Sequence, residues 1–128
     1  MAQFVIYGHA AARRPRIRQL SDAIHEAAVS ALQLPVDKRF HRFVPLDPDC
    51  FIAPPDRSHD YTVIEVSMFE GRSAATKKSL ILELFRTTSA IGLSVQDVEV
   101  TITETPRANW GIRGVPGDEL QLSYQVEV

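Results

Sequence analysis

A strand–helix–strand pattern occurs twice in this 128-residue sequence, with the two copies about sixty residues apart. Leu20 of the first copy aligns with Leu80 of the second, and Ile24 aligns with Leu84. Because two parallel strands can be joined only through a long crossover, each copy predicts a parallel strand pair connected by a helix. The repeat therefore indicates an old duplication, with halves of about residues 1–58 and 59–128 related by a pseudo-twofold axis.

Local patterns assign the elements of each half. Alternating or β-branched runs predict strands, and apolar residues at helical spacing predict two helices. Ser73 is a good N-cap for the second helix, and Gly92 is suited to the position just after its end. The expected strands span 4–7, 39–44, 61–68 and 98–103, with an edge piece at 50–52, a turn at 115–118 and a closing strand over 120–128.

Two helices can cover only one face of a four-stranded sheet. The predicted fold class is therefore α+β with two layers: duplicated β-α-β units, two helices on one face of the sheet, and a C-terminal hairpin and strand. We expect one domain over residues 1–128. The other face of the sheet would carry Tyr61, Val63 and Phe69 among polar side chains. A half-apolar uncovered face is an expected association surface, so the pattern predicts an oligomer.

Composition excludes several classes of protein. The net charge of −2, with 23% charged residues, provides no general attraction for nucleic acid or acidic membranes, so neither is expected as a partner. No apolar run approaches the length of a membrane span, and no basic leader followed by an apolar run suggests a secretory signal. The single cysteine, Cys50, excludes an internal disulfide and fits a reducing compartment, so a cytoplasmic location is expected.

Few residues carry a strong chemical signal. The four histidines lack metal-ligand spacing, so no metal or cofactor is expected. The basic cluster at 13–18 fits a solvated face, an anion site or a docking surface for an acidic partner. Arg72, just before the Ser73 cap, is a candidate carboxylate receptor. Trp110 and Arg113 lie on a glycine-flanked hairpin, where the tryptophan fits either core packing or a pocket wall.

Several segments together resemble the tautomerase superfamily. The segment 69–73 has the glycine–arginine–serine helix start, Lys77 and Lys78 follow in the helix, and segments 98–104 and 110–114 match the strand and the aromatic–glycine–isoleucine hairpin. The short 4-oxalocrotonate tautomerases carry a similar helix start, a similar strand and a similar hairpin. The duplicated length resembles the malonate semialdehyde decarboxylase branch, and the likeness covers essentially the whole chain.

The resemblance implies a homotrimer with helices outside and sheets inside. It also implies a chemistry in which an amino-terminal proline, exposed by removal of Met1, acts as base or acid on enols and 2-oxo acids. Carried over to this chain, Arg72 is the carboxylate binder and Trp110 the apolar wall. Lys38, Arg39 or Arg113 is then the candidate for a second positive contact with the substrate.

The chain departs from the family pattern at three positions. Residue 2 is alanine, the acidic residue of the decarboxylase branch falls on Lys38 with Asp37 one place early, and Glu70 replaces an arginine. Decarboxylation by that residue set is therefore not expected. The primary amine of Ala2 can still act as a base or form a Schiff base. Two functions remain open: a tautomerase-like isomerase of small 2-oxo acids using Ala2 and Arg72, and a non-catalytic trimeric protein that binds small carboxylates.

Overall fold

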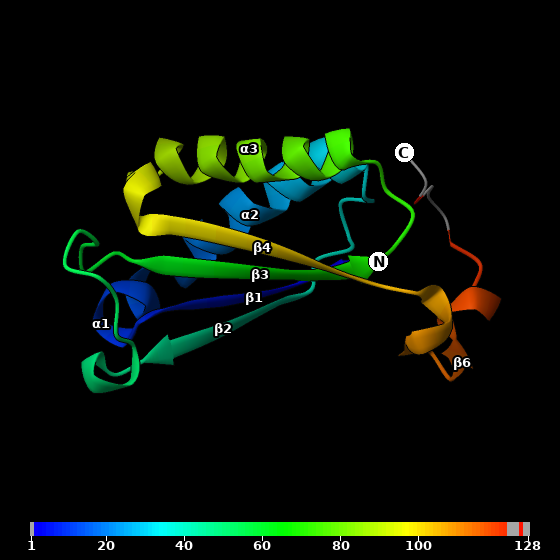
Figure 1. Cartoon of the computed structure of the whole chain (residues 1–128), viewed down its shortest axis with the longest axis horizontal. Helices are drawn as coiled ribbons and strands as arrows, with labels where there is room; N and C mark the ends of the chain where they lie inside the picture. Colours follow the sequence, from blue (N-terminus) through cyan, green and yellow to red (C-terminus); the bar gives the residue numbers. More distant parts are fainter. Residues whose placement is uncertain (1, 123–125, 127–128) are drawn as a thin grey trace.

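The protein is a two-layer structure in which helices lie on one side of a single sheet (Figure 1). The computed structural model describes residues 2–122 and 126. Its main sheet has the strand order β2-β1-β3-β4, and a separate hairpin pairs β5 with β6. The elements are β1 (Ala2–His9), α1 (Ala10–Arg13), α2 (Ile17–Leu32), β2 (His41–Leu46), β3 (Thr62–Phe69), α3 (Ala74–Ala90), β4 (Val98–Thr105), β5 (Gly111–Ile112) and β6 (Val115–Pro116).

The two halves meet at the centre of the sheet. β1 runs parallel to β2, and β3 runs parallel to β4, as a helical crossover in each half requires. β1 and β3 are antiparallel neighbours, with Ala2 opposite Met68 and Gly8 opposite Thr62. The α+β fold class is confirmed. Because β1 and β3 are antiparallel, each end of the sheet brings the first residues of one of these strands beside the last residues of the other.

The core lies between the sheet and the two long helices. Alternate residues of β1 and β3 point into it, as the period of a strand requires. The apolar residues at helical spacing that predicted the first helix, α2, supply much of the opposite layer. The fully or almost fully buried members of this core include Phe4, Ile6, Leu20, Ile24, Leu32, Ile64, Val66, Met68, Leu80 and Leu84.

Both ends of α3 form as the sequence predicts. The Ser73 hydroxyl accepts a hydrogen bond from the Thr76 amide at 3.1 Å, which satisfies one of the free N–H groups at the helix start. At the other end Gly92 has φ of +96°, a conformation that costs glycine little. The chain therefore leaves α3 toward β4 without strain.

Other boundaries differ from the prediction. β2 spans His41–Leu46, so it begins and ends two residues later than expected. It continues through Pro45 because an edge strand tolerates a residue with no N–H. The sequence predicts a linker over residues 8–12 between the first strand and the first helix, and this is wrong: β1 continues to His9, residues 10–13 form the short helix α1, and Pro15 lies in a 3-10 turn. The edge piece expected at 50–52 is also wrong, since residues 48–50 form a 3-10 turn.

The expected C-terminal hairpin is formed by β5 and β6, with its turn at 113–114 and not at 115–118. Arg113 and Gly114 have positive φ between β5 and β6, and a 3-10 turn follows at Gly117–Glu119. Residues 120–122 are not in a strand, and most of the expected closing strand lies outside the described residues. None of the helices within residues 2–122 is long and apolar enough to cross a membrane.

Candidate active site

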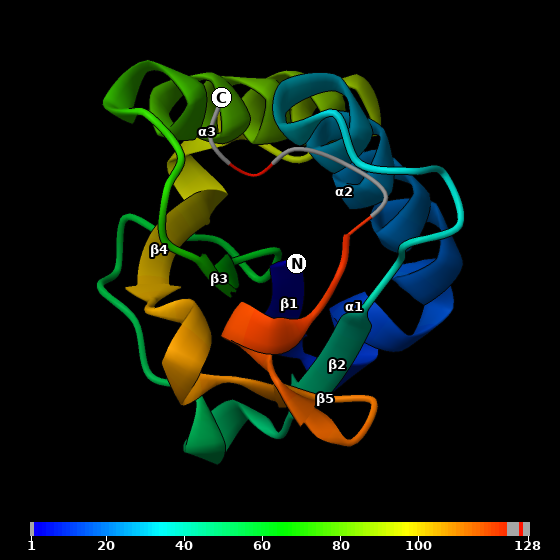
Figure 2. The same ribbon diagram turned by 90° about the vertical axis from the view of Figure 1, so that its right-hand side faces the viewer.

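Several of the sequence-predicted site residues lie near the end of the sheet where β1 begins and β3 ends. Figure 2 looks onto this end, with the start of β1 at its centre and the hairpin beside it. Ala2 is 3% exposed and pairs with Met68, so the first described residue of the chain is held within the sheet. A group at this position is therefore fixed in place, as a reacting amine requires.

Arg72 lies directly beyond the end of β3. Gly71, with φ of +124°, turns the chain there, and Arg72 itself is 5% exposed. Its Nη1 donates a hydrogen bond to the Leu32 carbonyl oxygen at 3.0 Å, at the C-terminal end of α2. The positive charge interacts favourably with the negative end of the α2 dipole, and the hydrogen bond satisfies one of the last carbonyls of that helix. Arg72 thus has a structural task, and its role as carboxylate binder stays a prediction.

An aromatic wall closes one side of this end. The Phe69 ring is fully buried and meets the Trp110 ring edge to face, with centroids 5.0 Å apart. The guanidinium of Arg107 lies over the Phe69 ring, 5.3 Å from its centroid. It also donates hydrogen bonds to the Gly117 and Leu120 carbonyls. Trp110 is therefore partly buried against Phe69 and partly exposed. Arg107, which the sequence analysis missed, clamps the segment after the hairpin against Phe69.

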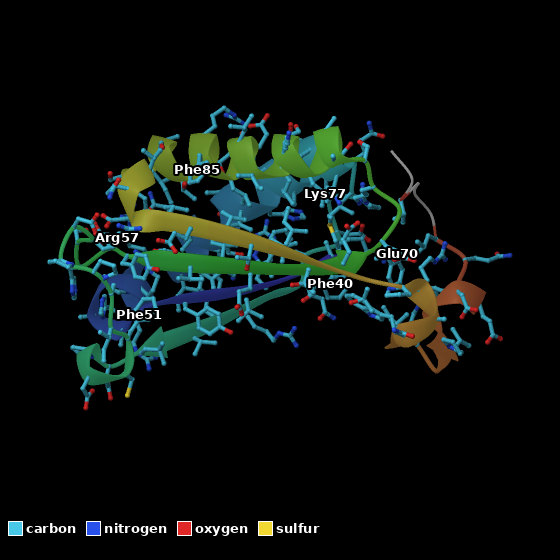
Figure 3. The ribbon with its side chains drawn as sticks, in the orientation of Figure 1. Phe40, Phe51, Arg57, Glu70, Lys77 and Phe85 are labelled. Atoms are coloured by element: carbon cyan, nitrogen blue, oxygen red, sulfur yellow. The ribbon has the colours of Figure 1, made fainter. Side chains whose placement is uncertain are left out.

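The start of β2 supplies the basic groups. Because Phe4 is opposite His41 in a parallel pair, Lys38 and Arg39 come near the level of Ala2. Arg39 Nη1 forms an ion pair with Asp22 at 2.6 Å, so its charge is partly used within the chain. A cavity of about 260 Å³ at this edge is lined by Gln3, Arg39, Phe40, His41 and Arg42. Figure 3 shows Phe40 and Glu70 at this same end of the molecule.

His41 is a residue of this cavity that the sequence analysis did not single out. Its Nδ1 shares a hydrogen bond with Ser21 Oγ at 2.8 Å, and its ring stands edge to face against Phe4. Burial is the main reason that its pKa falls to about 4, and the nearby positive charges of Arg39 and His25 lower it further. His41 is therefore neutral at pH 7, and only its contact with β1 across the sheet could have revealed it.

This low pKa predicts a pH-dependent stability. The folded-state pKa of about 4 lies below the ordinary histidine value of 6.5, so the unfolded chain binds the proton first as the pH falls. The loss of stability is absent above pH ~6.5 and grows as the pH falls to ~4, where it amounts to about 1–2 kcal/mol after a discount for partial solvent exposure. Urea unfolding of wild type and His41→Gln at several pH values measures it. Equal pH slopes in the two proteins would contradict the assignment.

The structure does not bring every candidate to this place. Arg113 is exposed at the hairpin turn, and lines a separate cavity of about 550 Å³ with Trp110 and other residues of 108–116. Within the basic cluster, Arg14 and Arg18 are exposed, whereas Arg13 is buried and Arg16 donates to the Ile91 carbonyl. A uniformly solvated basic face is therefore wrong. Over the described residues, no group of three His, Cys, Asp or Glu side chains could hold a metal ion.

Comparison with known proteins identifies the family. The family model described as Tautomerase enzyme (Tautomerase_2) matches residues 38–113, more than half of the chain. This chain belongs to the tautomerase family. This tautomerase-family protein is 40% identical to the 2-hydroxymuconate tautomerase of Pseudomonas putida over 57 residues, which are 44% of the chain and 90% of that relative. Almost the whole of that relative therefore matches less than half of this chain, which agrees with a chain of two similar halves.

Solved structures agree with this over most of the length. FG41 malonate semialdehyde decarboxylase, inhibited by 3-bromopropiolate, superposes with a TM-score of 0.77 and 28% identity, covering 85% of this chain and 87% of that one. R7 fused 4-OT, solved as an asymmetric trimer, gives a TM-score of 0.79 at 24% identity over 91% and 96% of the two chains. The likeness to R7 fused 4-OT shows that the two chains share a fold.

Proposed function

We propose that this protein interconverts the enol and keto forms of small 2-oxo acids. The observation that carries the proposal is the position of Ala2, buried at the start of β1 beside the end of β3 and an aromatic wall. With Met1 removed, Ala2 presents a primary amine at that point. A terminal amine titrates near pH ~8, and burial lowers that value, so much of it is free base at neutral pH.

The proposed step is a proton transfer with no net change in the protein. The Ala2 amine accepts the proton of the enol hydroxyl as the C=O bond forms, and the resulting ammonium returns a proton to the carbon of the former double bond. Arg72 contributes a buried positive charge at this end, where a carboxylate of the substrate binds. Lys38 or Arg39 supplies a second positive contact from the start of β2, and Trp110 excludes water.

The experiment compares two forms of the protein that differ only in the amine. One form has Ala2 as its first residue, verified by intact mass, and the other keeps one additional residue before Ala2. With the enol 2-hydroxymuconate as probe, followed by its ultraviolet absorbance, we expect turnover to be at least ~100-fold slower in the extended form. Equal turnover in the two forms would exclude the amine as the base.

The second candidate function is binding of small carboxylates without turnover. It is favoured by a single observation: residue 2 is alanine, which lacks the ring that orients a terminal proline nitrogen. This function predicts saturable binding of pyruvate that depends on Arg72, with no loss of enol absorbance at any pH. Turnover by the form that begins at Ala2 would exclude it.

We propose further that the protein is a homotrimer. The fused 4-OT structure with the same fold is a trimer, and the sheet face opposite the helices carries half-buried Val5, Val44 and Val63 among polar groups. Part of the predicted face is already covered within the chain, because Phe69 packs on Trp110 and Tyr61 on Phe51. Sedimentation equilibrium gives the mass of three 14.3 kDa chains if the proposal holds, and of one chain if it does not.

A further inference from the structure

Arg13 is a buried arginine at the end of the sheet opposite Ala2. It is 1% exposed, and within residues 2–122 and 126 neither Nε nor either Nη makes a hydrogen bond. The nearest carboxylate is that of Asp60, 3.9 Å from Nη2, and the Asp60 side chain is 43% exposed. A buried guanidinium carries five donors and keeps its charge, so leaving it with one distant carboxylate is costly.

Gly8 makes room for this side chain. A Cβ built on Gly8 would lie 2.3 Å from Arg13 Cγ and 2.7 Å from Cδ, far closer than atoms approach. Gly8 is in the middle of the sheet between Pro45 and Thr62, where glycine weakens a strand. Its φ is not in the left-handed region, so the glycine provides space and not an unusual backbone. The arginine is therefore built into the fold.

The hydrogen bonds at the ends of the two long helices show which task Arg13 does not have. At the Ala2 end, Arg72 donates to the Leu32 carbonyl at the end of α2. At the opposite end, the corresponding bond to the end of α3 is made by Arg16, which donates to the Ile91 carbonyl. The helix-end role in the first half thus belongs to Arg16. Arg13 is an additional buried cation for which the described part of the chain offers no comparable acceptor.

Two histidine rings and a phenylalanine ring pack together at this end of the sheet. The His9 ring stacks on the His59 ring with centroids 5.3 Å apart, and the Phe51 ring lies 5.1 Å from His9. His9 Nδ1 is buried and makes no hydrogen bond to any described residue. Figure 3 shows Phe51 at this end, far from Phe40. The Arg13 guanidinium carries a charge that one half-exposed carboxylate opposes, and an imidazole N–H can donate a further hydrogen bond, so this end of the sheet can take an anion.

We infer that this end of the sheet is a second binding site, which takes a small oxyanion, a carboxylate or a phosphate, on Arg13. The oxyanion takes the place nearest Nη2 while the Asp60 carboxylate turns toward water, and His9 supplies a further polar contact. The site binds without turnover, because the start of β3 lies within the chain and has no terminal amine. It therefore lies apart from Ala2 and does not depend on the function proposed for that end.

The test titrates the full-length protein with pyruvate and with inorganic phosphate, each at constant ionic strength against sodium chloride. Ring resonances of His9 and His59 report on this end of the molecule. We expect saturable shifts in wild type and in Arg72→Met, at least tenfold weaker binding in Arg13→Met, and several-fold tighter binding in Asp60→Asn. A response to one of the two anions defines the ligand class, and a response to both indicates a general oxyanion site.

Three results would overturn the inference: no saturable response to either anion, equal binding in Arg13→Met, or Asp60→Asn that binds no more tightly than wild type. Asp60→Asn is the decisive variant if Arg13→Met does not fold. If Asp60 were simply the internal partner of Arg13, its removal would lower the melting temperature in chloride and create no added affinity. If it competes with the oxyanion, the melting temperature rises more with pyruvate or phosphate than it does in wild type.

Discussion

Replacement of Gly8 by alanine is expected to lower the free energy of unfolding by about 3 kcal/mol. The added methyl would lie 2.3 Å from Arg13 Cγ and 2.9 Å from Nε, and Arg13 is fully buried, so its stem has no free space to move into. Relief requires a shift of β1 or α1, both of which pack against neighbours. Urea unfolding at pH 7 measures the loss.

A double-mutant cycle separates the clash from other effects of the methyl group. In an Arg13→Ala background the same change at Gly8 should cost less than ~1 kcal/mol, because the crowded atoms are gone. Gly111→Ala is the matched control, since nothing lies within 4 Å of a Cβ at Gly111 and that residue also sits in a strand. A Gly8 effect that persists unchanged without the Arg13 side chain would show that the glycine serves some other purpose.

Replacement of Arg72 by methionine is expected to lower kcat/KM for enol ketonisation about 100-fold, a loss of roughly 2.7 kcal/mol of transition-state stabilisation. The physical reason is the removal of a buried charge at the Ala2 end, where a carboxylate gains most from a cation. The measurement is steady-state turnover of the enol by the form that begins at Ala2, together with urea unfolding of the same sample.

Arg16→Met is the control for the structural task of Arg72. Arg16 donates to the Ile91 carbonyl at the end of α3 as Arg72 donates to the Leu32 carbonyl at the end of α2. Both variants should lose a similar amount of unfolding free energy, about 1–2 kcal/mol. Only Arg72→Met should lose turnover. Equal loss of turnover in both would assign the Arg72 effect to folding, and would remove Arg72 from the proposed mechanism.

The layered fold was predictable because its determinants are local. Leu80 and Leu84 repeat at helical spacing, Ser73 caps α3, and the strand that became β3 alternates along its length. β2 was misplaced because a proline normally argues against a strand, and only its position at the sheet edge makes Pro45 acceptable.

The site was less predictable because its geometry depends on contacts distant in sequence. Arg13 was grouped with exposed arginines by the charge-run pattern, yet the space over Gly8 buries it. Arg72 was recognised by its neighbours, but its bond to Leu32, forty residues away, could not be seen in a local pattern. His41 lies near the start of β1 only because β2 pairs with that strand. Each of these depends on the packing of the two halves, which a one-dimensional pattern does not contain.

The antiparallel pairing of β1 with β3 also has an evolutionary consequence. In an assembly of identical short subunits, any substitution appears at both symmetry-related ends of the paired strands at once. In a single chain the two ends have different sequences, so Arg72 at one end and Arg13 at the other can change independently. Each end still draws residues from both halves, with Ala2 beside Met68 and Arg13 beside Asp60. A single chain thus lets the two ends differ, while each end still needs both halves of the chain to form.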